Sequence, residues 1–122
     1  MPSFSRGDIV RVPFPYTDGR TTQKRPALVV SDGAVGDAGL LLWVVMITSA
    51  RNRAWAGDVP LGDTYDAAGL PAPSMVRPAK IASIEAARAE TIGRLPDALL
   101  AKVDETIAAV LGRQVDDLRK PG

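Results

Sequence analysis

The sequence contains no cysteine and no histidine among its 122 residues. The absence of cysteine excludes disulfides, thiol nucleophiles and cysteine-ligated zinc. The absence of histidine excludes a Ser-His-Asp triad, histidine-ligated metal and acid–base catalysis by a histidine pair. An all-carboxylate magnesium site stays open, but the acids form no compact pair except Asp116-Asp117. Any catalysis would therefore rest on Arg, Lys, Ser, Thr, Tyr or carboxylate side chains.

The sequence also has no large excess of positive or negative charge and no long apolar run. Lys and Arg number 15 against 14 Asp and Glu, which gives a net charge of +1, so a basic site would have to be local. The longest apolar run, residues 40–47, is far shorter than the ~20 residues of a membrane helix. Residues 1–8 lack the apolar core of a signal peptide. We expect a cytoplasmic protein with no membrane partner.

The composition is that of a folded chain with one core, since 46% of the residues are hydrophobic and 24% are charged. We expect a single domain over residues 1–112. Residues 113–122 are mostly charged or polar and end in Pro-Gly, so we expect a flexible tail there.

Short β-rich runs separated by turn-rich links occupy most of the chain. The run at 40–47 has no polar alternation, which predicts a central strand covered on both faces. Prolines at the end of the first run predict that this strand ends there or lies at an edge. The expected strands are 7–14, 27–30, 40–47, 59–61, 75–84 with a break at Pro78, and 91–95.

One helix is expected near the C-terminus. Pro96 suits its first position, Asp97 suits its first turn, and Gly112 suits its end. Its apolar stripe comprises Leu99, Val103, Ile107 and Val110, with Leu100 and Leu111 beside it. The fold class is therefore mainly β, a small β-barrel or strongly curved sheet capped by a C-terminal helix.

Two polar loops concentrate positive charge. Arg20, Lys24 and Arg25 fall in the first loop, and Arg51 and Arg53 in the second. Asp18 and Asp58 flank these loops, but residues 19–25 and 48–57 contain no acid, so converging loops would form a local basic groove for nucleic acid. A solvated loop is the alternative for the two arginines of the second.

Trp55 in the second loop and Tyr16 in the first suit stacking on nucleic-acid bases. For Trp55 the alternative is packing at an interface with a second copy or a protein partner.

Seven short blocks resemble the MazF/PemK toxins, in family order and over roughly residues 7–112. They are Gly-Asp-Ile-Val at 7–10, Val-Pro-Phe-Pro-Tyr-Thr-Asp at 12–18, Lys-Arg-Pro-Ala-Leu-Val-Val-Ser at 24–31, Ile-Thr-Ser at 47–49, Gly-Leu at 69–70, Ser-Met-Val-Arg at 74–77 and Ile-Gly-Arg-Leu at 92–95.

The resemblance implies a toxin of a type II toxin–antitoxin module with an SH3-like barrel and a C-terminal helix. It implies a homodimer that cleaves single-stranded RNA without a metal or other cofactor. It also implies a cognate antitoxin, which should be acidic and partly disordered, that covers the RNA site. The gyrase poison CcdB shares this fold, so the fold alone does not establish RNA cleavage.

Arg25 is the first catalytic candidate implied by the resemblance. It is expected at the end of the first long loop, just before a strand and followed by the stiff Pro26. Its planar guanidinium matches phosphate oxygens. The alternative is a surface arginine bridging to a nearby carboxylate.

Thr48 and Ser49 end the central strand, where their hydroxyls could donate to a phosphate or orient the 2′-OH. The alternative is a simple strand-end cap. Arg77 is the second cationic candidate, with an exposed strand residue as the alternative. Some relatives carry an Asp two residues after this arginine, whereas this chain has Ala79, followed by Lys80.

The identity of a general base stays open, because arginine has a reference pKa above about 12. Either Arg25 and Thr48 act through electrostatic stabilisation, or another acid such as Asp18 takes part, or cleavage is slow. The alternative functions are a weak RNA- or antitoxin-binding module and a gyrase poison. The expected RNA contacts are Tyr16, Thr17, Arg20, Lys24, Arg51, Arg53, Trp55 and Lys80.

Overall fold

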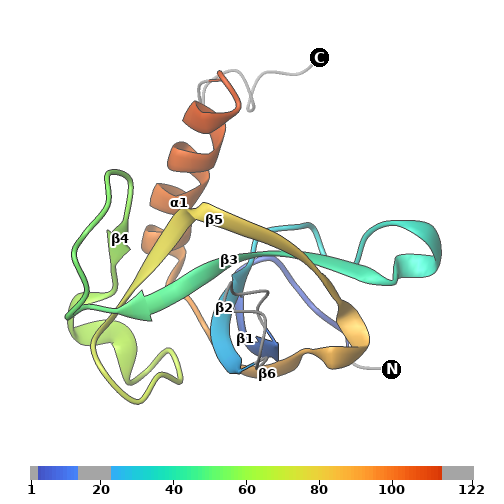
Figure 1. The fold of residues 1–122 in the computed structure, drawn as a ribbon, viewed down its shortest axis with the longest axis horizontal. Coiled ribbons are helices and arrows are strands. Elements are labelled where there is room, and N and C mark those ends of the chain that lie inside the picture. Colours follow the sequence, from blue (N-terminus) through green and yellow to red (C-terminus); the bar gives the residue numbers. More distant parts are fainter. Residues whose placement is uncertain (1–2, 14–22, 114–122) are drawn as a thin grey trace.

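The computed structural model describes residues 3–13 and 23–113 (Figure 1). Six antiparallel strands form a curled half-barrel sheet in the order β4-β5-β3-β2-β1-β6. The strands are β1 (Asp8–Pro13), β2 (Lys24–Val29), β3 (Leu41–Ser49), β4 (Val59–Pro60), β5 (Ser74–Glu85) and β6 (Glu90–Arg94). The helices are η1 (Asp37–Gly39), η2 (Gly62–Tyr65), η3 (Ala86–Arg88) and α1 (Asp97–Val110). The predicted mainly-β class with a C-terminal helix is confirmed.

Each predicted strand is present, but the predicted break at Pro78 is wrong. β5 runs through Pro78 because the strand bulges there. Arg77 pairs with Met46 of β3 while Ile81 pairs with the adjacent Val45, so residues 78–80 lack a partner in that ladder. Proline has no amide hydrogen and is tolerated at such a bulge. Figure 1 shows that β5 bends along its length.

Both faces of the sheet bury apolar side chains. One, the helix face, packs Val45 and Ile47 of β3 against Val103 of α1. The other, the opposite face, buries Val44 and Met46 with residues of β1 and β2. The prediction that the central strand is covered on both faces is confirmed for these residues. It is wrong at Trp43, whose exposed fraction is 53%.

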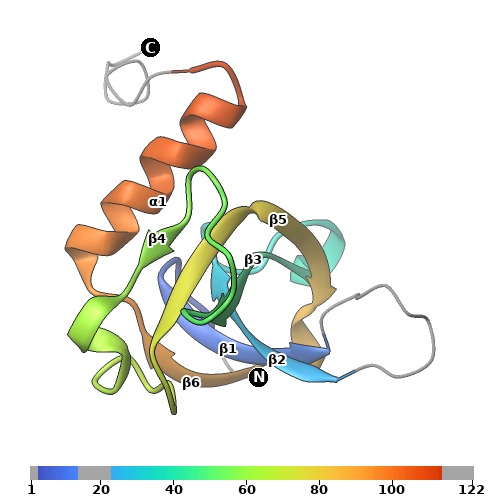
Figure 2. The same cartoon turned by 60° about the vertical axis from the view of Figure 1, so that its left-hand side comes forward.

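Helix α1 packs against β4 and β5 (Figure 2). Pro96 is its N-cap with an extended ψ of 142°, so the helix begins one residue later than predicted. Gly112 has a φ of +76° just beyond the helix, which confirms the predicted end. Val110 and Leu111 are exposed, so the predicted buried stripe stops short of them. None of the helices in the described ranges is long and apolar enough to cross a membrane.

Two sequence blocks that are far apart meet through their backbones. A Cβ added at Gly93 of β6 would lie 1.7 Å from the carbonyl oxygen of Ala68, and one at Gly69 would lie 2.1 Å from that of Ile92. Only glycine permits this approach. The contact fixes the segment after η2 against the edge strand β6.

Candidate functional site

Arg25 lies inside β2 as its second residue, so the expectation that it ends a loop before the strand is wrong. It pairs with Val12 of β1, which places its side chain on the opposite face of the sheet. The side chain is exposed, and Nη2 donates a hydrogen bond of 3.2 Å to Gln23 Oε1. Pro26 follows it within the strand. A guanidinium on a rigid strand is thus presented to solvent.

Thr48 lies on the same face of the neighbouring strand. Ala27 of β2 pairs with Met46 of β3, and continuing that register by two residues places Arg25 across from Thr48. Thr48 is buried, and its Oγ1 accepts a 2.7 Å hydrogen bond from Asn52 Nδ2. The β2–β3 ladder itself ends at Ala27 and Met46, so the two leading candidates share a face just beyond the paired part of these strands.

Ser49 is the exposed last residue of β3. Its Oγ accepts a 3.1 Å hydrogen bond from the backbone N–H of Arg51. Together with the Thr48–Asn52 bond, this contact turns the chain from β3 into the following loop, residues 50–58. Both hydroxyls therefore cap the end of the strand, as the alternative interpretation expects. Ser49 is exposed and also remains accessible to a ligand.

Arg77 is buried, so the alternative of an exposed strand residue is wrong. Its side chain is 7% exposed and that of Asp58 is 4% exposed. Nη2 lies 2.9 Å from Asp58 Oδ2 and 2.8 Å from the carbonyl oxygen of Arg53, and Nε lies 3.2 Å from Asp58 Oδ1. The guanidinium therefore joins the bulged strand to both the middle and the end of loop 50–58.

Asp58 is held ionised by these contacts. Desolvation raises the pKa of its carboxyl, but the hydrogen bonds from Arg77 and from the backbone N–H of Trp55, with the positive charge of Arg77, lower that pKa below its ordinary value. The Trp55 N–H lies 2.8 Å from Asp58 Oδ2. The Asp58 carboxylate thus accepts hydrogen bonds from a side chain of β5 and from the backbone of loop 50–58.

Trp55 completes this arrangement, which we call the Arg77 cluster: Arg53, Trp55, Asp58, Arg77 and Lys80. Arg77 Cζ lies 4.1 Å from the centroid of the Trp55 ring, within cation–π range. Lys80 Nζ, from the bulge of β5, lies 5.4 Å from the same centroid. The indole is 36% exposed. It is anchored and still accessible.

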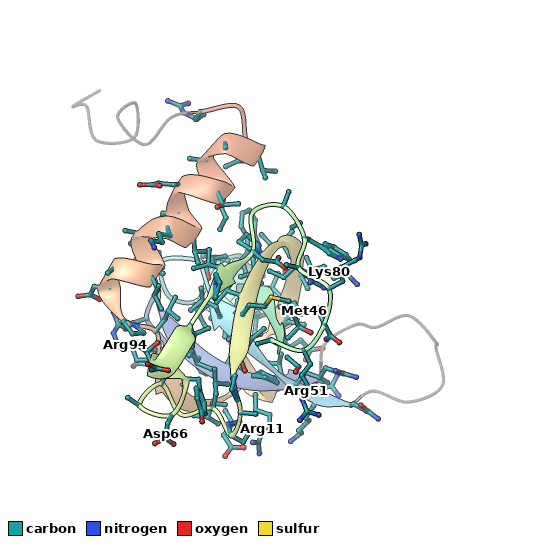
Figure 3. All side chains as sticks on the ribbon, turned by 90° about the vertical axis from the view of Figure 1, so that its left-hand side faces the viewer. Arg11, Met46, Arg51, Asp66, Lys80 and Arg94 are labelled. Carbon is teal, nitrogen blue, oxygen red and sulfur yellow. The ribbon has the colours of Figure 1, made fainter. Side chains whose placement is uncertain are left out.

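The predicted RNA contacts divide into groups. Arg51, Arg53 and Trp55 share loop 50–58, and Lys80 joins them through Trp55. Figure 3 shows Lys80, Met46 and Arg51 on one side of the molecule, away from Arg94 and Asp66. Lys24 instead lines a groove with Arg11, Leu70 and Ile92, apart from Arg25. Tyr16, Thr17, Asp18 and Arg20 lie outside the described residues.

The roles of Asp58 and Asn52 are not predicted by the sequence, in which Asp58 is only an acid beside a basic loop. In the structure Val59 pairs with Val76, so Asp58 faces Arg77 one step along the same register. Asn52 carries no signal in the sequence that distinguishes it from other polar loop residues. Within residues 3–13 and 23–113, no group of three or more acidic side chains is placed to hold a metal ion.

Both the sequence and the fold of this chain are similar to those of known toxins. The profile of the PemK-like, MazF-like toxins of type II toxin–antitoxin systems matches residues 5–111. The crystal structure of MazF from Deinococcus radiodurans is 26% identical, with a TM-score of 0.72, and the match covers 92% of this chain and 99% of that one. No functionally curated protein matches the sequence significantly.

Two further solved structures extend the comparison. A MazE–MazF complex from Deinococcus radiodurans is 25% identical, with a TM-score of 0.73 and coverage of 93% and 100%. An endoribonuclease from a mycobacterial species is 21% identical, with a TM-score of 0.69 and coverage of 93% and 95%, which supports the fold alone. The profile spans most of the chain, and the chain belongs to the PemK-like, MazF-like toxin family of type II toxin–antitoxin systems.

Proposed function

We propose that this toxin is a metal-independent endoribonuclease that cleaves single-stranded RNA and leaves a 2′,3′-cyclic phosphate and a 5′-OH. The observation that carries the proposal is the exposed guanidinium of Arg25, on a strand beside Thr48 and on the same face. Membership of the toxin family supports it, and the mycobacterial protein that shares the fold is an endoribonuclease. The sequence supplies no histidine or cysteine for other routes.

In the proposed reaction the 2′-oxygen attacks the adjacent phosphorus while the bond from phosphorus to the 5′-oxygen breaks. Arg25 donates to the non-bridging oxygens and stabilises the extra charge of the phosphorane. The hydroxyls of Thr48 and Ser49 orient the 2′-OH or donate to the phosphate. The 2′-OH proton leaves to solvent, and solvent protonates the departing 5′-oxygen.

Asp58 does not serve as the general base in this scheme, because its carboxylate is buried and paired with Arg77. The Asp of some relatives is replaced by the exposed Ala79. A positioned base or acid contributes typically about 10²–10⁴-fold. We therefore expect electrostatic stabilisation by Arg25 to dominate, and a slow chemical step.

The cationic side chains around the site would hold the RNA. Arg51, Arg53 and Lys80 supply positive charge along loop 50–58 and the β5 bulge, and Trp55 supplies a stacking surface. Single strands fit this arrangement because their bases are free to stack. The proposed contacts outside this group are Tyr16, Thr17, Arg20 and Lys24.

The test is incubation of purified protein with single-stranded RNA in EDTA. We expect cleavage by the wild type and its loss in Arg25→Ala. Intact RNA after incubation with wild type, so that wild type and Arg25→Ala behave alike, would contradict the proposal.

The replacement at Ala79 favours one alternative, a toxin that binds RNA or its antitoxin with little cleavage. Binding of RNA without new ends in the EDTA assay would support that alternative. Inhibition of DNA supercoiling that survives Arg25→Ala would instead indicate a gyrase poison of the CcdB kind.

Two protein partners are proposed. A cognate acidic antitoxin would cover the cationic loop 50–58, as the existence of MazE–MazF complexes supports.

A second copy of the chain would cover an apolar surface on the helix face, beside α1, where a groove includes Trp43, Ile81 and Leu111. These side chains are 53%, 53% and 71% exposed. Such patches mark interfaces. Sedimentation should give a dimer for wild type and a monomer for Ile81→Glu, and a wild-type monomer at micromolar concentration would contradict the dimer.

A further inference from the structure

We propose that Arg77 acts as a positioning residue: with Asp58 it clamps loop 50–58 and fixes the Trp55 indole as a one-sided stacking platform for an RNA base. The inference rests on the proposed ribonuclease function and names the part of the site that holds the substrate. It assigns Arg77 a different role from Arg25, which contacts the phosphate.

The contacts of Arg77 leave it poorly placed to meet a phosphate. Its Nε and Nη2 groups donate to Asp58 and to the Arg53 carbonyl oxygen. The side chain is only 7% exposed. A phosphate would have to displace a buried carboxylate, which would then lose its compensating charge.

The same contacts constrain the loop at three successive points. Arg77 bonds the backbone carbonyl of Arg53, its guanidinium lies 4.1 Å from the Trp55 centroid, and it pairs with Asp58 where the loop enters β4. Asp58 in turn accepts from the Trp55 N–H. A loop with exposed residues at 50–57 is thereby tied to a strand of the sheet.

This arrangement decides how Trp55 can meet a base. A guanidinium 4.1 Å from the centroid occupies one face of the indole. Lys80 Nζ also lies over the ring, at the longer distance of 5.4 Å, and Trp55 is still 36% exposed. A single base can stack on the accessible part of the ring, where Lys80 can neutralise the adjacent phosphate. The clamp organises this surface before RNA arrives, so binding does not have to order the loop.

The experiment uses the Trp43→Phe chain, in which Trp55 is the only tryptophan. Arg77→Met, Trp55→Ala and the double variant are compared, with Arg6→Met as the matched control. Arg6 forms an ion pair with Asp104 of α1 that is more exposed than the Arg77–Asp58 pair, so the control removes an arginine–carboxylate contact outside loop 50–58. Asp58→Asn/Arg77→Met removes both charges and replaces Arg77→Met if that variant does not fold.

The first readout is Trp55 fluorescence without RNA. We expect Arg77→Met to shift the emission to longer wavelength and to raise acrylamide quenching toward the value of the denatured protein, with Arg6→Met unchanged. An unchanged Trp55 signal in folded Arg77→Met would overturn the clamp. This arm does not depend on RNA cleavage, so it stands even if the proposed function fails.

The second readout is kinetic. We expect Arg77→Met and Trp55→Ala each to raise KM for a single-stranded RNA by about tenfold, within the range of one lost base stack, with little change in kcat. The double variant should be no worse than either single variant, because Arg77 acts through Trp55. A fall in kcat at unchanged KM, or additive losses, would overturn the proposal and favour direct catalysis by Arg77.

Discussion

Arg25 and Arg77 lie on the same face of one sheet, but in opposite environments. Arg25 pairs with Val12 in β2 and reaches solvent. Arg77 pairs with Met46 in β5 and is enclosed by Asp58, Trp55 and the Arg53 backbone. From the sequence, Arg25 is the first cationic candidate and Arg77 the second. These surroundings support the proposal that the exposed guanidinium takes part in cleavage and that the buried one positions loop 50–58.

The contrast between Arg25 and Arg77 indicates how a chain with a net charge of only +1 can form a local cationic surface. Asp58 balances Arg77 within the protein, so that pair adds no net charge to the surface. Arg25, Arg51 and Arg53 are all exposed, and they are cations that we propose contact RNA. The net charge of +1 therefore does not show that some cations are buried in ion pairs while others lie on the surface.

The largest expected effect is on stability at the Arg77 cluster. Asp58→Ala leaves Arg77 as a buried charge without its carboxylate, which should lower the free energy of unfolding by about 3–5 kcal/mol. Arg25→Ala should change it by less than about 0.5 kcal/mol, because the side chain is exposed. Urea unfolding of both variants measures the difference, and equal losses would remove the contrast between the two arginines.

The next effect is on activity at Arg25. Arg25→Ala should slow single-turnover cleavage by about 10²–10³-fold, the loss typical of one transition-state donor. Arg25→Lys should recover only part of the rate, since an ammonium lacks the planar fork. Full activity in Arg25→Lys would show that charge alone, without bidentate geometry, is sufficient.

Acid should weaken the Arg77 cluster in a defined direction. The pKa of Asp58 is lower in the folded chain than the ordinary 3.8, so its contribution to stability is complete above that value and is lost as the pH falls through the folded pKa. The free energy of unfolding of wild type should therefore fall more steeply below the ordinary pKa than that of Asp58→Asn. Parallel pH curves for the two proteins would contradict the assignment.

The smallest expected effect is on the salt dependence of RNA binding. Arg51→Gln and Arg53→Gln should each reduce the slope of log K against log salt by about 0.7, the value for one phosphate contact on a single strand. Fluorescence anisotropy with a 2′-O-methyl RNA, which lacks the attacking hydroxyl, measures this slope. If neither substitution alters it, loop 50–58 does not contact the RNA backbone.

Much of the fold could be predicted because it follows local patterns. Apolar runs bounded by turn residues predict the strands, and the spacing of Leu99, Val103 and Ile107 predicts α1. The bulge at Pro78 could not be predicted, since the same proline signals a strand end when no partner strand is known. The exposure of Trp43 could not be predicted, because an apolar run does not reveal which of its side chains the fold leaves uncovered.

The site was predictable in part. The motif positions predict Arg25 and Thr48, which lie on the same face of neighbouring strands, two residues beyond the Ala27–Met46 pair. The pairing of Asp58 with Arg77 was missed because it depends on how β4 aligns with β5, 19 residues further along the chain. A charge on a loop and a charge on a strand become partners only once that register is known.

The most direct test of the account is the mapping of 5′-hydroxyl ends in RNA treated with wild type and with Arg25→Ala in EDTA. The account predicts new ends at a short recurring motif with wild type and a loss of those ends with Arg25→Ala. The same ends at the same frequency with Arg25→Ala would show that cleavage does not depend on this guanidinium.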